Sequence, residues 1–230
     1  MNTRPFNQVF FDCDSTLTRI EGIDELASKA GVADQLVPLT TAAMNGELAL
    51  EEVYSRRLHV IQPTRQDLDW LSQRYQEELV DDAIEVVAKL QQLGKQVHII
   101  SGGLRQPIIK MGAVLGIKAE NIHAVEISFD DSDHYAGFEQ TSTLACNGGK
   151  AKVCESLAKE NDRNVLVGDG VTDLEANDVG VVVIGFGGVV RREEVVKRAA
   201  VFVDGPGLSN VLEVILTPEE KTKVMINSDL

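Results

Sequence analysis

The sequence of 230 residues has little basic charge and no long hydrophobic run. Lys and Arg number 22 against 36 Asp and Glu, which gives a formal net charge of −14 at pH 7. Nucleic acids and anionic membranes bind basic surfaces, so this balance argues against both as partners. No apolar stretch approaches the roughly 20 residues that a membrane-spanning helix needs. The remaining function classes are those of a globular protein that binds small molecules or other proteins.

Cysteine and histidine are scarce, and neither residue type indicates a site. The three cysteines are odd in number and match no CxxC metal pattern, which fits a reducing compartment. The histidines are scattered and form no metal-type pair. The N-terminus also lacks a basic segment followed by an apolar signal core, so we expect a cytoplasmic protein. These residues are Cys13, Cys146, Cys154, His59, His98, His123 and His134.

A short apolar strand near the start of the chain ends in acidic residues. Residues 9–11 (Val-Phe-Phe) predict a buried strand, and an Asp-x-Asp-x-Thr run follows at positions 12–16. Side chains two apart lie on the same side of an extended chain, so Asp12 and Asp14 can face one pocket beyond the strand. Two buried carboxylates repel each other unless a cation or a shared proton compensates. The alternative, a solvated acidic turn, is outweighed by matching residues later in the chain.

The next part of the chain predicts helices and no strand. Apolar residues have helical spacing over 23–30, over 34–44 with Asp34 as a cap, over 48–61, and from Pro63-Thr64 to about residue 76. Such a block between the first strand and the next β unit is typical of an insertion. We expect residues 19–77 to form a helical cap domain over the site. Residues 1–18 and 78–230 then form an α/β core domain.

Strands and helices alternate through the rest of the chain. We expect helices over 81–93, 107–115, 149–160, 192–199 and 209–216, and strands over 96–100, 164–167, 181–184 and 200–203. Residues 122–129 and 135–138 flank a polar turn and predict a β-hairpin. The alternation predicts the α/β class with a doubly wound, mostly parallel sheet. The polar tail after Pro218 is expected to be loose.

Polar residues gather near strand ends at four places along the chain. Carboxylate oxygens suit Mg²⁺, and an ammonium group with a metal ion reduces the repulsion between a carboxylate nucleophile and a phosphate. A serine hydroxyl and glycine amides can hold phosphate oxygens at a helix start. The set therefore predicts phosphoryl transfer through an aspartyl phosphate, with a second acid to move the proton. Its members are Asp12, Asp14, Ser101, Gly102, Gly103, Lys150, Asp169 and Asp173.

In this order the motifs resemble those of the haloacid dehalogenase superfamily of phosphatases. The resemblance implies a Rossmann-like core, Asp12 as the nucleophile and Asp14 as the general acid/base. It also implies that Ser101 and Lys150 hold the phosphoryl group. Taken singly, Lys150 would be read as an exposed helix lysine and Ser101 as a helix cap.

The same resemblance implies a magnesium site. Mg²⁺ is expected on the Asp12 carboxylate, the Asp14 backbone carbonyl and Asp169. Asp173 is expected to support these ligands from behind.

Within this superfamily the chain resembles the phosphoserine phosphatases from about residue 8 to residue 216. Phosphoserine carries an ammonium and a carboxylate besides its phosphate, so a selective pocket needs an acid and an arginine. The stretches that carry the resemblance are 14–27, 57–63, 135–138, 148–150 and 184–188.

By this resemblance, Glu21 takes the ammonium, Arg57 grips the carboxylate and Met44 forms an apolar wall. Without it, Glu21 would be read as a first-turn helix acid and Arg57 as part of a solvated helix face. Where the family usually has a glycine after the methionine, this chain has Asn45. The remaining residues expected to bind the substrate are Gly102, Gly103 and Thr172.

The expected activity is Mg²⁺-dependent hydrolysis of O-phospho-L-serine to L-serine and phosphate, the last step of serine synthesis in this family. Another small phosphomonoester, such as phosphoethanolamine or phosphothreonine, is an alternative substrate. Transfer of the phosphoryl group to an acceptor alcohol, and a catalytically silent Mg²⁺-binding relative, also stay open. The expected partner is a small-molecule substrate, and the chain is expected to be a monomer or a homodimer.

Overall fold

The computed structural model describes residues 4–227, and its centre is a six-stranded sheet with the order β3-β2-β1-β6-β7-β8. Every neighbouring pair in this sheet is parallel. A separate antiparallel pair, β4 and β5, lies beside it. The strands are β1 (Gln8–Phe11), β2 (Gln96–Leu104), β3 (Ile122–Val125), β4 (Ile127–Phe129), β5 (Tyr135–Phe138), β6 (Asn164–Gly168), β7 (Val182–Phe186) and β8 (Val201–Val203).

The central strands are apolar after their first residue, because helices cover both faces of the sheet. All residues of β1 and β6 are buried, as expected for inner strands of a parallel sheet. The chain leaves β1 toward β2 and β3, then returns to β6 on the other side of β1. This reversal creates a switch point beside β1, where open α/β sheets bind ligands beyond the strand ends. The predicted α/β class with a doubly wound parallel sheet is confirmed.

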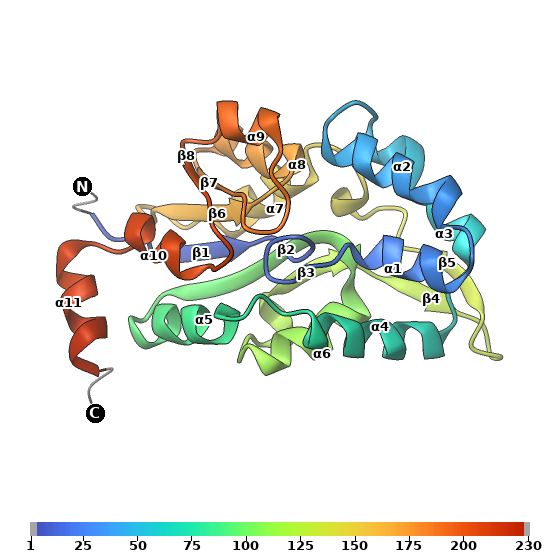
Figure 1. Ribbon diagram of the computed structural model, residues 1–230, viewed down its shortest axis with the longest axis horizontal. Coiled ribbons are helices and arrows are strands. Elements are labelled where there is room, and N and C mark those ends of the chain that lie inside the picture. Colours follow the sequence, from blue (N-terminus) through green and yellow to red (C-terminus); the bar gives the residue numbers. More distant parts are fainter. Residues whose placement is uncertain (1–3, 228–230) are drawn as a thin grey trace.

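Helices form layers on the two sides of the sheet, with α5 and α6 below it and α7, α8 and α9 above it in Figure 1. Among the described residues, no helix is both long enough and apolar enough to cross a membrane. Short 3₁₀ turns cover Ala119–Asn121, Thr143–Ala145 and Glu175–Val179. The helices after the first 80 residues are α5 (Ala83–Gln92), α6 (Arg105–Val114), α7 (Gly149–Leu157), α8 (Val171–Leu174), α9 (Glu193–Arg198), α10 (Ser209–Ile215) and α11 (Pro218–Asn227).

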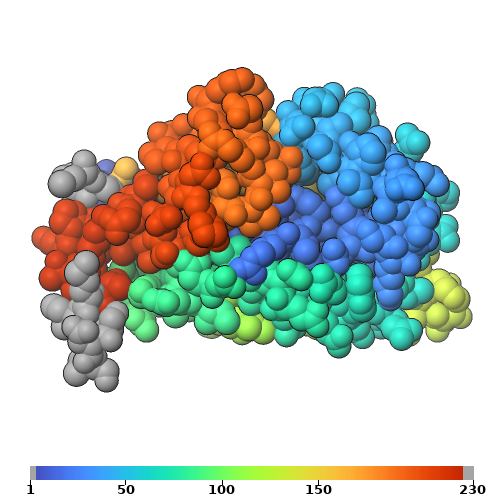
Figure 2. Space-filling view, viewed as in Figure 1, coloured from blue at the N-terminus to red at the C-terminus, as the bar shows by residue number. Residues whose placement is uncertain are grey.

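Four helices without a strand follow β1, as the sequence predicts. The last of them begins at a capping box, in which Thr64 and Asp67 bond each other's backbone amides. Figure 2 shows the α2 part of this segment, in light blue, against the orange surface of the α9 region. The four helices are α1 (Gly22–Lys29), α2 (Ala33–Met44), α3 (Leu50–Ile61) and α4 (Arg65–Glu77).

The predicted hairpin over residues 122–138 is wrong in its first arm. The run over 122–129 divides at Glu126 into two strands with different partners. β3 pairs with β2 in the main sheet, and only β4 pairs with β5. β2 also differs from its prediction, because it continues past Ile100 through Ser101, Gly102 and Gly103 to Leu104.

Two further predictions are wrong. The described part of the tail, Pro218–Asn227, forms α11 instead of a loose segment, and residues 228–230 lie outside the described residues. Glu220 on this helix bonds the buried Lys95 ammonium at 2.6 Å. Asp34 does not cap α2, because the helix already includes it and Val32 occupies the capping position.

Candidate active site

The two aspartates that follow β1 have different hydrogen-bond partners. The Asp12 amide donates to the Val167 carbonyl of β6 at 2.9 Å, so this residue continues the sheet. The Asp14 side chain accepts hydrogen bonds from the Gly22 amide at 2.7 Å and from the Tyr75 hydroxyl at 2.8 Å. Burial and the charge of Asp12 raise the pKa of Asp14 to about 6. A carboxyl group with this pKa can both give and take a proton near neutral pH.

Lys150 lies between two of the predicted acids. Its ammonium is 2.9 Å from Asp12 and 2.7 Å from Asp173. Burial opposes its charge, but these two carboxylates raise the pKa of Lys150 above its ordinary value, so the side chain stays cationic. The start of α7 can approach this closely because position 149 is glycine: a Cβ there would lie 2.0 Å from the Thr143 carbonyl oxygen.

Asp169 and Asp173 follow β6 and complete an acidic cluster. Carboxylate oxygens of Asp12, Asp169 and Asp173 all lie within 4.8 Å of one another, and all three residues are buried. Burial and the Asp12 charge raise the pKa of Asp169 and of Asp173 to about 7. Asp173 is held by Lys150 through one oxygen and by the Gly170 amide, at 2.9 Å, through the other.

The acidic cluster fits a divalent cation. Six acidic side chains outnumber three basic ones in and directly behind the pocket. The oxygens are hard donors of the kind that Mg²⁺ binds. The acids are Asp12, Asp14, Glu21, Asp169, Asp173 and Glu175, and the bases are Arg57, Lys150 and Arg192.

One charged residue at the site, Arg192, carries no signal in the sequence. Its Nε donates to the Asp169 carboxylate at 3.1 Å, and one terminal nitrogen donates to the Asn45 side-chain oxygen at 3.1 Å. Its other terminal nitrogen lies 3.7 Å from Glu21. The adjacent Arg191 is exposed and pairs with Asp204 instead. Two neighbouring arginines look alike in a sequence, so only the fold shows which of them faces the acids.

The helical segment supplies the other end of the pocket. Arg57 is only 4% exposed, and one terminal nitrogen donates to the Thr40 hydroxyl at 3.2 Å. Its Nε has no hydrogen-bond partner within the described chain. Glu21 accepts a hydrogen bond from the Ser15 hydroxyl at 2.8 Å, and burial followed by the Asp14 charge raises its pKa well above the ordinary value. Thr40 was also not among the predicted site residues, because a threonine inside a helix carries no signal of a site.

Ser101 lies where β2 reaches the pocket. Its hydroxyl oxygen accepts a hydrogen bond from the Gly103 amide at 2.9 Å. A Cβ at Gly103 would lie 2.9 Å from an Asp14 oxygen and 3.1 Å from the Ser101 hydroxyl, so backbone without a side chain faces the acids. Tyr54, on α3, donates to the Gly102 carbonyl at 2.9 Å.

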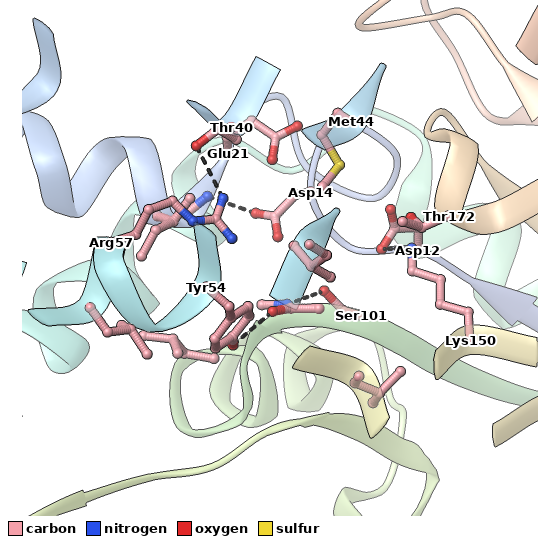
Figure 3. A pocket seen from close by; sticks show the side chains of 18 of the residues that line it. Asp12, Asp14, Glu21, Thr40, Met44, Tyr54, Arg57, Ser101, Lys150 and Thr172 are labelled. Carbon is pink, nitrogen blue, oxygen red and sulfur yellow. Dashed lines mark hydrogen bonds and ion pairs between the residues drawn. The ribbon is translucent and has the colours of Figure 1, made fainter. Parts of the chain in front are cut away.

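One pocket joins all of these groups, and Figure 3 shows the labelled side chains pointing into it. Asp169 and Asp173 lie behind this lining, in contact with Arg192 and Lys150 respectively. The structure thus brings together residues that are up to 161 positions apart, as the sequence predicts for a single site. The predicted residues that line the pocket are Asp12, Asp14, Glu21, Met44, Arg57, Ser101, Gly102, Gly103, Lys150 and Thr172.

The fold places a carboxylate, a lysine and a serine at one pocket beyond the strand ends, an arrangement typical of one class of hydrolases. The sequence model of the haloacid dehalogenase-like hydrolases matches residues 9–177. The chain belongs to this family, and it is an enzyme of the phosphatase type.

The individual proteins to which the chain is similar include phosphoserine phosphatases. The chain is 38% identical to the phosphoserine phosphatase of Homo sapiens over 197 residues, which cover 85% of this chain and 88% of the human one. A solved phospho-aspartyl intermediate analogue of phosphoserine phosphatase is similar in structure, with a TM-score of 0.81, 25% identity and coverage of 93% and 100% of the two chains. A phosphoserine phosphohydrolase-like protein from Francisella tularensis shares the fold at a TM-score of 0.82, with 23% identity over 91% of this chain and 100% of that one.

Proposed function

We propose that the chain hydrolyses O-phospho-L-serine to L-serine and phosphate, with Mg²⁺ as its cofactor. The observation that carries this proposal is a single pocket with two chemically different ends. One end holds Asp12, Lys150 and Ser101, which suit a phosphoryl group. The other end holds a half-buried acid, Glu21, and a buried arginine, Arg57, which suit an ammonium and a carboxylate.

The contacts at the first end support the following roles. Lys150 and Ser101 hold phosphoryl oxygens, and the Gly102 and Gly103 backbone lies beside them. Asp12 attacks phosphorus and forms an aspartyl phosphate while the bond to the serine oxygen breaks. Asp14 gives a proton to that leaving oxygen, and then takes a proton from the water that hydrolyses the intermediate.

The proposed metal ligands are Asp12, the Asp14 backbone carbonyl and Asp169. The clustering of carboxylate oxygens and the excess of negative charge support this assignment. When bound, Mg²⁺ would neutralise part of the charge that accumulates on the phosphoryl oxygens. Asp173 has both oxygens engaged by Lys150 and Gly170, which suits a role in orienting the lysine.

At the second end, Arg57 has an unpartnered Nε that can donate to a substrate carboxylate. Glu21 lies nearer the catalytic loop and can accept from the substrate ammonium. Met44 and Thr172 line the pocket between the two ends.

We also propose a division of the chain into two domains. Residues 19–77 form a cap, and residues 1–18 with 78–230 form the core. Two observations support this division: four consecutive helices lie between β1 and α5, and an isolated bridge joins Thr18 to Leu79 where the segment begins and ends. Three free cysteines are consistent with a cytoplasmic enzyme of serine biosynthesis. We propose a monomer or a homodimer as the working form.

A panel of phosphomonoesters tests the function. Phosphate release is measured with phosphoserine, phosphothreonine, phosphoethanolamine and an aryl phosphate, each with Mg²⁺ and with EDTA, and each with and without homoserine as an acceptor. We expect phosphoserine to have the highest kcat/KM and EDTA to abolish its turnover. A clear preference for another ester, or phosphoryl transfer to homoserine, would replace the proposed activity. No release from any ester would indicate a silent relative.

A further inference from the structure

Tyr54 connects the two ends of the pocket without belonging to either set of predicted residues. It lies on α3, is 4% exposed, and its ring centroid is 5.1 Å from that of Phe138. The guanidinium carbon of Arg57, one helical turn further on, is 5.6 Å from the Tyr54 ring centroid. The Tyr54 hydroxyl reaches the opposite way and donates to the Gly102 carbonyl at 2.9 Å (Figure 3).

The Gly102 carbonyl and the Gly103 amide belong to one peptide group. The described chain contains no cis peptide bond, so the carbonyl and the N–H of this group point in opposite directions. A hydrogen bond to the carbonyl therefore also sets the direction of the N–H. This N–H donates to the Ser101 hydroxyl oxygen at 2.9 Å.

Little else restrains this peptide group. Glycine lies on both sides of it, and glycine adopts many backbone conformations at small cost. The ladder between β2 and β3 is irregular from Ile100 to Leu104, so regular strand pairing does not fix the group either. The hydrogen bond from Tyr54 is thus the identified contact that holds the Gly102 carbonyl.

The orientation of this peptide group also affects the hydroxyl of Ser101. Because the Ser101 oxygen accepts from Gly103, its own proton is free to donate to another acceptor in the pocket. Hydrogen bonds in such a chain strengthen one another. Burial raises the pKa of Tyr54, so its hydroxyl remains a donor at any working pH.

We propose that Tyr54 is a positioning residue for phosphoryl binding. Its hydroxyl fixes the Gly102–Gly103 peptide, and this peptide directs the Ser101 hydroxyl at a phosphoryl oxygen. Because Tyr54 and Arg57 share one turn of α3, the same helix that binds the substrate carboxylate also sets the geometry of the phosphoryl site. This inference rests on the proposed phosphatase function and adds a residue to it.

The test is Tyr54→Phe, which keeps the ring and removes only the hydroxyl. We expect kcat/KM to fall about three- to tenfold with phosphoserine and equally with an aryl phosphate, since one neutral hydrogen bond is lost. Inhibition by inorganic phosphate should weaken by a similar factor. The matched control is Tyr135→Phe, because the Tyr135 hydroxyl has no hydrogen bond to the rest of the described chain and does not line the pocket.

A double-mutant cycle with Ser101→Ala distinguishes positioning from packing. If Tyr54 acts through Ser101, adding Tyr54→Phe to Ser101→Ala should change kcat/KM and phosphate inhibition by less than twofold. Additive losses in the cycle would overturn the proposal. So would a Tyr54→Phe variant with wild-type phosphate inhibition, or one that loses activity on phosphoserine alone.

These outcomes are separate from the substrate assignment. If the wild-type chain cleaves an aryl phosphate and not phosphoserine, the proposed substrate is wrong. The effect of Tyr54→Phe on kcat/KM can then still be measured with the aryl phosphate. If the wild type prefers phosphoserine and the Tyr54→Phe variant matches it on every readout, only the positioning role is wrong.

Discussion

The two ends of the pocket differ in how their charges are satisfied. At the end formed by the sheet, Lys150 is bound by two carboxylates, and Asp173 uses both oxygens. At the end formed by the helices, Arg57 has a single side-chain hydrogen bond and a buried Nε without a partner in the described chain. The lysine of the first end is fully paired within the protein, while the arginine of the second end keeps a donor for a ligand.

This difference corresponds to two tasks: the first end carries out the proposed reaction, and the second recognises the substrate. Groups that must stabilise changing charge benefit from being fixed before the substrate arrives, and the ends of packed strands provide this rigidity. Groups that select a substrate gain most when their hydrogen bonds are completed only by the correct ligand.

The largest effect is expected from Asp12→Asn, at the end formed by the sheet. An amide is not a nucleophile toward phosphorus, so kcat should fall by more than about a thousandfold with phosphoserine and with an aryl phosphate alike. The exposed Asp131→Asn is the matched control. Circular dichroism and thermal unfolding should match the wild type. Residual activity within tenfold of the parent would contradict the nucleophile assignment.

Arg57→Ala should affect the other end alone. Loss of charge-assisted hydrogen bonds to the substrate carboxylate should lower kcat/KM for phosphoserine roughly 10- to 100-fold. The aryl phosphate lacks this carboxylate, so its turnover should change little. The neighbouring Arg56→Ala is the control, because that side chain is exposed. Equal losses on both substrates would show that the two ends are not distinct.

Tyr75→Phe tests a contact that crosses from the helices to the catalytic loop. The Tyr75 hydroxyl donates to Asp14 at 2.8 Å, and its removal should lower kcat roughly tenfold on both substrates, because Asp14 loses one of its two orienting hydrogen bonds. KM should stay near the wild-type value. A change confined to KM would mean that Tyr75 serves binding and not proton transfer.

The smallest expected effect is on stability, at a histidine that lies outside both ends of the pocket. His98 on β2 is buried beside His123, at 3.3 Å between ring nitrogens, and burial lowers the pKa of His98 to about 4. The unfolded chain takes up this proton below about pH 6.5, while the folded chain does so only near pH 4. The free energy of unfolding should therefore decrease as the pH falls through this window. In His98→Gln this decrease should be smaller.

Denaturant titrations at pH 7 and pH 4.5 measure this change, with His59→Gln on the exposed side of α3 as the control. An unchanged pH dependence in His98→Gln would contradict the buried-histidine account. Activity at neutral pH should be the same in all three proteins, which would separate the stability of the sheet from the chemistry at its edge.

The main sheet was predictable because its inner strands are short apolar runs followed by polar residues. The elements that were wrong depend on contacts between distant residues. α11 has a polar sequence, and its Glu220 contacts Lys95, a residue 125 positions earlier. The run over 122–129 divides because its first half pairs with β2 and its second half with β5. The sequence of a single run does not show which strands it will pair with.

The predicted site residues could be chosen because four short motifs each follow a strand or open a helix. Their spatial gathering around one pocket agrees with that choice, while their catalytic roles remain predictions. Arg192 and Tyr54 were not predictable. Each acts through a contact with a residue at least 23 positions away, and neither type nor spacing distinguishes it from its neighbours.

The most direct measurement is the location of the phosphoryl group during turnover. The enzyme is mixed with radiolabelled phosphoserine and Mg²⁺, quenched in acid and digested, and the labelled peptide is sequenced. The account predicts a label on Asp12 that hydroxylamine removes, as expected for an acyl phosphate. A label on a peptide without Asp12, or turnover with no label on Asp12 at any quench time, would contradict it.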